Sequence, residues 1–164
     1  MGKSFDIISH FEGCKLEAYK CPAGVWTIGY GCTDPHYAFE GNVIDMGTAN
    51  NLLIADMKDA KSTIKTLVTR AMDDNQLACL LSGAFNLSWR SNKNLAGYFN
   101  RDIELYKKKL LMYCNADGKK LNGLLIRRVC ERLLFEDRDW LPVAESLQRA
   151  NTMERTEEAI LELF

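Results

Sequence analysis

The segment from Phe11 to Gly31, FEGCKLEAYKCPAGVWTIGYG, restricts the fold of this chain more than any other part of the sequence. Two short runs within it, 16–20 and 25–30, alternate and are rich in aromatic and β-branched residues, which is typical of β-strands. The Cys-Pro-Ala-Gly sequence at 21–24 supplies a turn between them. We therefore predict a tight β-hairpin near the start of the chain.

The remaining sequence is dominated by helical patterns. A short helix is predicted for 3–12, and Thr48 is a good N-cap for a helix of about twenty residues, or ~30 Å, that would connect two lobes. Asp74 opens a segment, 75–87, that is apolar nearly all round and so fits the central helix of a bundle. We also predict helices at 92–100, 102–114 and 123–135. Pro142 is expected to break the chain, and a last helix is expected to begin at its N-cap, Thr152.

Charge and hydropathy exclude several classes of protein. The net charge of −1 gives no global attraction to nucleic acid, and no apolar run reaches the ~18 residues that span a bilayer. We expect no nucleic-acid partner, no membrane insertion and no signal peptide, and hence synthesis in the cytoplasm. Residues 101–132 carry nine Lys/Arg and four Asp/Glu, whereas 133–164 carry three and eight. The first stretch either faces a polyanion or is simply a solvated helical face.

The six cysteines show no CxxC or other metal-ligand spacing, so we expect no metal and no cofactor. Cys79 and Cys130 lie within apolar helical patterns and are expected to be core residues. Cys14, Cys21 and Cys32 cluster around the predicted hairpin, where the sequence allows either free thiols or a disulfide.

The hairpin segment carries three chemically competent side chains. Eight residues separate Glu12 from Cys21, and five separate Cys21 from Thr27. Glu12 lies at the C-terminal end of the first predicted helix, where the dipole disfavours a negative charge and favours a proton-donating carboxyl. Such an acid, facing a second group across a groove, suits cleavage of a glycosidic bond. Each residue also has a structural alternative, since single Glu, Cys and Thr residues in such places are usually solvated or packed.

Three blocks of the sequence resemble the phage-type lysozymes (endolysins), glycoside hydrolase family 24. The pattern FEG-x-x-L-x-AY-x-C-x-x-G-x-x-TIGYG is similar to the catalytic segment of that family, which has Glu, eight residues, Asp or less often Cys, five residues and Thr. DNQLACLLSGAFNLS at 74–88 and NGLLIRRVCERLLF at 122–135 are similar to two further family blocks. The resemblance covers about residues 5–135.

The resemblance implies an α+β, mainly helical, lysozyme-like fold in one domain, 1–164. A small catalytic lobe, about 12–60, would be joined by a long helix to a helical lobe of about 70–164 plus 1–11, with a glycan-binding cleft between them. The residues implied as catalytic are Glu12, Cys21 and Thr27, and those implied as substrate-binding are Thr33, Phe85, Asn86, Arg127 and Arg128. Core packing is an equal alternative for Phe85. One arginine would reach toward Glu12 or order the cleft, and the other could be solvated.

The implied activity is that of a muramidase, which cuts the β-1,4 bond between N-acetylmuramic acid and N-acetylglucosamine and so lyses bacteria. We expect a monomer that acts on peptidoglycan glycan strands of the cell wall after release from the host cytoplasm. Cys21 replaces the commoner Asp, and a thiol with the ordinary pKa of ~8.5 is mostly neutral at pH 7. A lytic transglycosylase using Glu12 alone, or an inactive peptidoglycan-binding module, is therefore an open alternative. The absence of CxxC disfavours a thiol redox protein.

Overall fold

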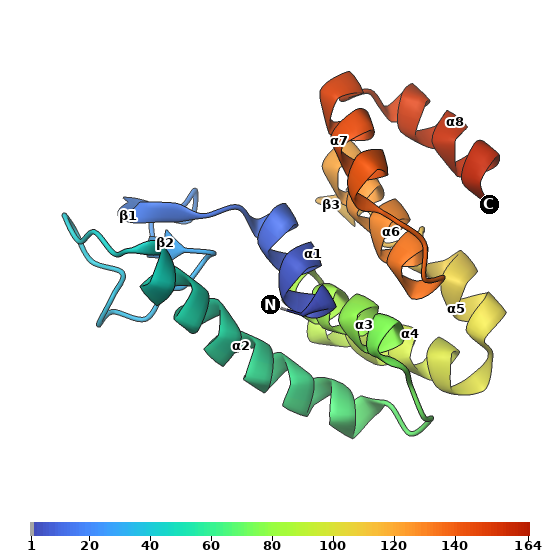
Figure 1. Ribbon diagram of the computed structural model, residues 1–164, viewed down its shortest axis with the longest axis horizontal. Coiled ribbons are helices and arrows are strands. Elements are labelled where there is room, and N and C mark those ends of the chain that lie inside the picture. Colours follow the sequence, from blue (N-terminus) through green and yellow to red (C-terminus); the bar gives the residue numbers. More distant parts are fainter. Residues whose placement is uncertain (1) are drawn as a thin grey trace. The chain divides into compact units, whose positions relative to one another are not determined.

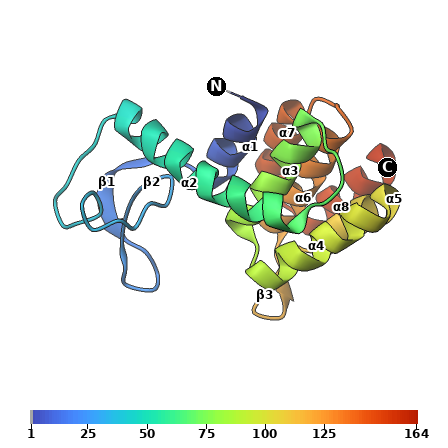
Figure 2. The same ribbon diagram turned by 90° about the horizontal axis from the view of Figure 1, so that it is seen from below.

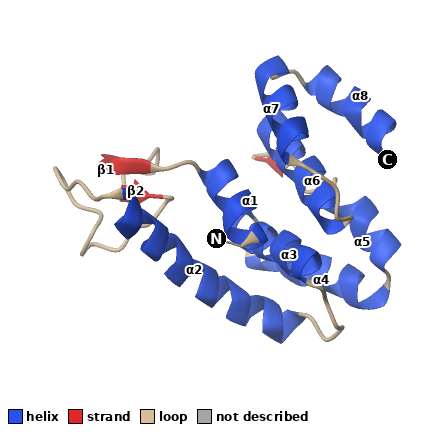
Figure 3. Ribbon diagram, viewed as in Figure 1, coloured by secondary structure: helices blue, strands red, loops and turns tan. Residues whose placement is uncertain are grey.

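The computed structural model describes residues 2–164, which fall into two compact units, one ending at Ser62 and the other running from Thr63 to Phe164. Within this described part there are eight α-helices and two small antiparallel sheets (Figures 1 and 3). The predicted α+β, mainly helical class is confirmed. The single-domain organisation and the grouping of residues 1–11 with the helical lobe stay predictions.

The first unit contains the hairpin. Its elements are α1 (Lys3–Glu12), β1 (Lys15–Lys20), β2 (Trp26–Gly29) and the larger part of α2 (Met46–Leu67). β1 and β2 pair antiparallel, with Tyr19 opposite Thr27, and the register shifts between Lys15 and Tyr19. The predicted short helix and hairpin are thus both present at nearly the predicted bounds.

The hairpin has a small core of its own, which the following loop completes. Its members are buried or partly buried apolar side chains, namely Ala18, Trp26, Ile28, Cys32, Ala38 and Ile44. The loop returns to β1, where Ile44 N donates to Leu16 O and Ala18 N donates to Asn42 O, both at 2.9 Å. The turn-rich segment after β2 is therefore tied by backbone hydrogen bonds to the edge of the hairpin.

Helix α2 is one unbroken helix that continues through the boundary between the two units. Its cap differs from the prediction. The Asp45 carboxylate accepts a hydrogen bond from Thr48 N at 2.7 Å, and Asp45 O accepts one from Ala49 N at 3.0 Å. Asp45 thus caps the helix, because its side chain satisfies a first-turn amide. The prediction of Thr48 as the cap was wrong, whereas the long helix itself is confirmed.

The second unit is helical apart from one short hairpin (Figure 2). Its elements after α2 are α3 (Asp74–Asn86), α4 (Trp89–Arg101), α5 (Ile103–Leu110), β3 (Asn115–Ala116), β4 (Lys119–Lys120), α6 (Asn122–Phe135), α7 (Leu141–Ala150) and α8 (Met153–Leu163). Helix α6 contacts α3, α5, α7 and α8. The core is built around α3 and α6, whose buried apolar side chains include Leu80, Leu81, Leu125, Ile126, Val129 and Leu133.

Three differences from the predicted helices have local physical causes. Asp73, rather than Asp74, caps α3 through a capping box with Gln76. Pro142 lies in the first turn of α7, where its missing N–H costs no hydrogen bond, so it starts a helix instead of breaking the chain. The helix predicted for 102–114 ends at Leu110, and the Asp117–Gly118 pair, with φ of 50° and 73°, then closes the β3–β4 hairpin.

The C-terminal segment packs onto the same helical unit. Thr152 accepts a hydrogen bond from Arg155 N at 3.3 Å, which confirms it as the cap of α8. Arg138 Nη1 donates to Leu163 O at 2.8 Å, and the Arg132 guanidinium carbon lies 3.8 Å from the centre of the Phe164 ring. The helices α7 and α8 thus pack on α6 of the helical unit.

Candidate active site

Cys21 occupies the first position of the hairpin turn. Its backbone N–H donates to Val25 O at 2.9 Å, and its carbonyl accepts from Gly24 N at 2.8 Å. Gly24 has φ of 80°, a left-handed conformation that other residues rarely adopt. This is the pattern of a three-residue hairpin loop closed by a left-handed glycine. The turn therefore holds the Cys21 side chain at a fixed corner between β1 and β2.

Hydrogen-bond donors surround the Cys21 thiol. The backbone N–H groups of Val25 and then Ala23 lower the pKa of this thiol, burial opposes them, and the Thr27 hydroxyl lowers the pKa further. Thr27 Oγ1 also donates to Val25 O at 3.1 Å. Since a hydroxyl has a single proton, Thr27 donates either to this carbonyl or to the Cys21 sulfur. Cys21 and Thr27 therefore lie close together.

Glu12 is the last residue of α1 and is exposed. The helix ends there because Gly13 adopts φ of 66° while its N–H still bonds Ser9 O at 3.2 Å. The chain then enters β1 at Lys15, so the hairpin directly follows the Glu12 helix (Figure 1). Thr33, also exposed, comes after the turn at the end of β2.

A second polar pair in the same unit joins Cys14 and Tyr30. Burial raises the pKa of the Cys14 thiol, and the Tyr30 hydroxyl partly offsets this. Tyr30 in turn donates to Asn50 Oδ1 on α2 at 3.1 Å. All six cysteines are free thiols in the structure, so the alternative of a disulfide among Cys14, Cys21 and Cys32 is not the state seen.

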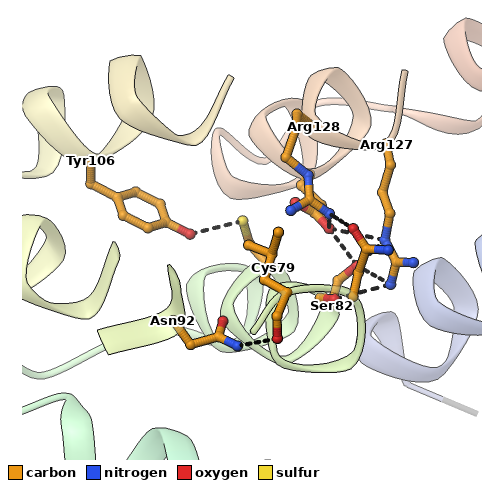
Figure 4. Close-up of polar contacts among 9 residues, drawn as sticks. Cys79, Ser82, Asn92, Tyr106, Arg127 and Arg128 are labelled. Carbon is orange, nitrogen blue, oxygen red and sulfur yellow. Dashed lines mark hydrogen bonds and ion pairs between the residues drawn. The ribbon is translucent and has the colours of Figure 1, made fainter. Parts of the chain in front are cut away.

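In the second unit, two arginines share one buried carboxylate (Figure 4). Glu131 Oε1 accepts from Arg128 Nη2 at 2.8 Å and from Arg127 Nε at 3.3 Å. It also accepts from Ser82 Oγ on α3 at 2.6 Å. Arg127 and Arg128 are 3% and 0% exposed, and Glu131 is 0% exposed. The alternative that one of these arginines is solvated was therefore wrong, because Glu131, one helical turn further on, holds both inside.

The network extends to the end of α3. Arg128 Nη2 donates to Asn86 Oδ1 at 3.1 Å, and both Asn86 and its neighbour Phe85 are half-buried. Sequence reasoning missed Ser82 and Glu131. The available signal was the spacing of Glu131, three and four residues after the arginines, on a helix face that is otherwise apolar.

Among residues 2–164 no helix is long and apolar enough to cross a membrane.

Comparison with known proteins places the hairpin and the paired arginines in one family. A family model described as phage lysozyme matches residues 9–131, a range that includes the hairpin and the paired arginines. The chain belongs to the phage lysozyme family.

Individual relatives agree with this assignment. The endolysin of Acyrthosiphon pisum secondary endosymbiont phage 1 is 31% identical over an alignment of 144 residues, which covers 82% of this chain and 95% of that protein. The structure of an endolysin from Escherichia coli O157:H7 phage FAHEc1 is 27% identical with a TM-score of 0.73, covering 82% of this chain and 91% of that chain. A mutant P22 lysozyme is 27% identical with a TM-score of 0.75, covering 83% and 97%.

This phage lysozyme accordingly has the lysozyme-like fold that was predicted. It is a glycoside hydrolase of the lysozyme class that cleaves peptidoglycan, and endolysins of this kind act on the bacterial cell wall and cause lysis. The family model spans the β1–β2 hairpin and most of α6, whereas α7 and α8 lie outside it.

Proposed function

We propose that this phage lysozyme is a muramidase that hydrolyses the β-1,4 bond between N-acetylmuramic acid and N-acetylglucosamine. Glu12 is the general acid, and Cys21 is the second group, which activates water. The observation that carries this proposal is the place of Cys21 in the hairpin turn, where the backbone N–H groups of Val25 and Ala23 and the Thr27 hydroxyl lower the pKa of its thiol. A lowered pKa raises the thiolate fraction near neutral pH, so the cysteine can do the work of the commoner aspartate.

In the proposed reaction, Glu12 donates its proton to the glycosidic oxygen while the bond from that oxygen to the anomeric carbon breaks. A water molecule adds to the same carbon and passes a proton to the Cys21 thiolate. The Thr27 hydroxyl, which is within hydrogen-bonding reach of the sulfur, stabilises the thiolate by a hydrogen bond or binds the water molecule. Proton exchange with solvent then restores the acid and the thiolate.

Substrate binding is proposed for Thr33, Phe85, Asn86, Arg127 and Arg128. Arg128 has no exposed surface, so its part in binding is indirect.

We also propose that the protein acts as a monomer and is synthesised in the host cytoplasm. Analytical ultracentrifugation and fractionation of infected cells test these two points, and a stable dimer or exported precursor would contradict them.

Glu12→Gln tests the acid directly, because an amide cannot donate the required proton. We expect lysis of permeabilised cells to fall by about 10²–10⁴-fold with the fold intact, as judged by circular dichroism. The matched control is Glu17→Gln, which removes an exposed carboxylate from β1 of the same hairpin and should leave lysis unchanged. A folded Glu12→Gln enzyme with wild-type lysis would remove Glu12 from the mechanism.

A further inference from the structure

We propose that Arg128 is a positioning residue that orients the side-chain amide of Asn86, so that Asn86 Nδ2 donates a hydrogen bond to an acceptor oxygen of the glycan. The inference rests on the proposed function, in which Asn86 binds substrate. Arg128 cannot touch the glycan itself, because its side chain is 0% exposed.

The chemistry of the two groups fixes the orientation. A guanidinium has only donors, so the group that faces Arg128 Nη2 at 3.1 Å must be the amide oxygen of Asn86. The amide nitrogen then points away from Arg128. Asn86 Nδ2 has no acceptor within residues 2–164, and the side chain is half-buried rather than enclosed. The result is a donor that is oriented but unused by the protein.

The support behind Asn86 is rigid. Arg128 Nη2 also donates to Glu131 Oε1 at 2.8 Å, and that oxygen is held in turn by Ser82 and Arg127. Arg128 Nε and Nη1 have no hydrogen-bond partner in the described part of the chain, so Nη2 carries both contacts. Turning the guanidinium would break them together, and both are charge-assisted, which makes them stronger than neutral hydrogen bonds.

The backbone at this point is fixed as well. Asn92, on α4, donates from Nδ2 to Leu87 O at 2.9 Å and to Ser88 O at 3.2 Å, directly after Asn86 (Figure 4). The end of α3 is thus held from α4, while the Asn86 side chain is held from α6. Peptidoglycan offers two kinds of acceptor for such a donor, namely acetamido carbonyl oxygens and ring hydroxyl oxygens.

A double-mutant cycle tests whether Arg128 acts through Asn86. We expect Asn86→Ala to raise the KM for solubilised glycan strands about 5–10-fold, the effect of one hydrogen bond, with kcat within about 2-fold. Arg128→Met should raise KM similarly, and the double variant should add nothing further. Asn86→Asp keeps the acceptor for Arg128 but lacks the donor, so it should behave like Asn86→Ala. Additive effects, or an unchanged KM in Asn86→Asp, would overturn the inference.

A second measurement does not require Arg128→Met to fold. The protein carries Glu12→Gln so that turnover of the strands is strongly slowed. The NMR signals of the Asn86 Nδ2 protons are identified as those that disappear when Asn86→Asp is added. Peptide-free glycan strands should shift these signals. Loss of the shift with de-N-acetylated strands identifies an acetamido acceptor, and its retention identifies a hydroxyl.

If the protein binds the strands but the Asn86 Nδ2 signals do not shift, the positioning role of Arg128 is rejected and the proposed function is not. Failure of the wild-type enzyme to cleave peptidoglycan would instead reject the proposed function, so the two failures are distinguishable.

Discussion

Glu131→Gln should destabilise this lysozyme strongly, although the residue is not assigned to catalysis. The Glu131 carboxylate is 0% exposed and balances two guanidiniums that are themselves 3% and 0% exposed. Glutamine keeps the shape of the side chain but removes its negative charge, which leaves the two buried guanidiniums without a counter-charge. Removing one partner of a buried ion pair costs about 3–5 kcal/mol. For a chain of this size, about 1 kcal/mol lowers Tm by roughly 2–4 °C, so we expect Tm to fall by about 6–20 °C.

Thermal unfolding followed by circular dichroism measures this shift. The matched control is Glu158→Gln, which breaks the exposed pair between Arg155 and Glu158, whose side chains are 47% and 53% exposed. Exposed pairs contribute about 0–1 kcal/mol, so Tm of the control should change by no more than about 4 °C. Equally small shifts for both variants would refute the claim that the buried carboxylate holds α3 and α6 together.

Further predictions concern the Cys21 thiol. Cys21→Asp should keep or raise lysis, and Cys21→Ala should lose much of it; wild-type hydrolysis by Cys21→Ala would show that the two-group mechanism is wrong. Because the group that activates water must be ionised, kcat/KM of the native enzyme should rise with pH through the lowered pKa of Cys21, and Cys21→Asp should move that rise to more acidic pH. Iodoacetamide or mild oxidant should inhibit the native enzyme, with only the oxidant effect reversed by dithiothreitol. Cys79 and Cys130 should react slowly, because burial raises the pKa of both thiols, and Cys21→Asp should resist alkylation. Full activity after mass spectrometry shows Cys21 modified would exclude a catalytic role for the thiol.

Local chemistry made much of the fold predictable. The Cys-Pro-Ala-Gly turn and the flanking β-branched residues give the hairpin, and Thr152 gives the start of α8, because each signal acts over a few residues. The failures arose where two local signals competed. Asp73 and Asp74 are equally good caps by residue type, and the capping box with Gln76 decides between them. Pro142 was interpreted as a helix breaker, although proline is equally suited to a first helical turn.

In the candidate site, contacts between residues close in sequence could be predicted, whereas contacts made by the packing of distant helices could not. Cys21 and Thr27 lie on one short turn, so their proximity could be predicted from spacing. Ser82 and Glu131 are 49 residues apart in sequence and meet only because α3 packs on α6. The spacing of Glu131 indicates pairing with the arginines of its own helix, but nothing in one sequence shows that Ser82 and Glu131 meet. The burial of both arginines follows from that packing and could not be predicted either.

The most direct test of the central claim is mass analysis of the sugars that the wild-type enzyme releases from purified peptidoglycan. Hydrolysis by this lysozyme should release fragments with N-acetylmuramic acid at a free reducing end, each carrying the atoms of one added water molecule. Anhydro-muramic ends, lighter by that one water, would identify a lytic transglycosylase. That result, or reducing ends that carry N-acetylglucosamine instead, would contradict hydrolysis of the muramic acid bond by Glu12 and Cys21.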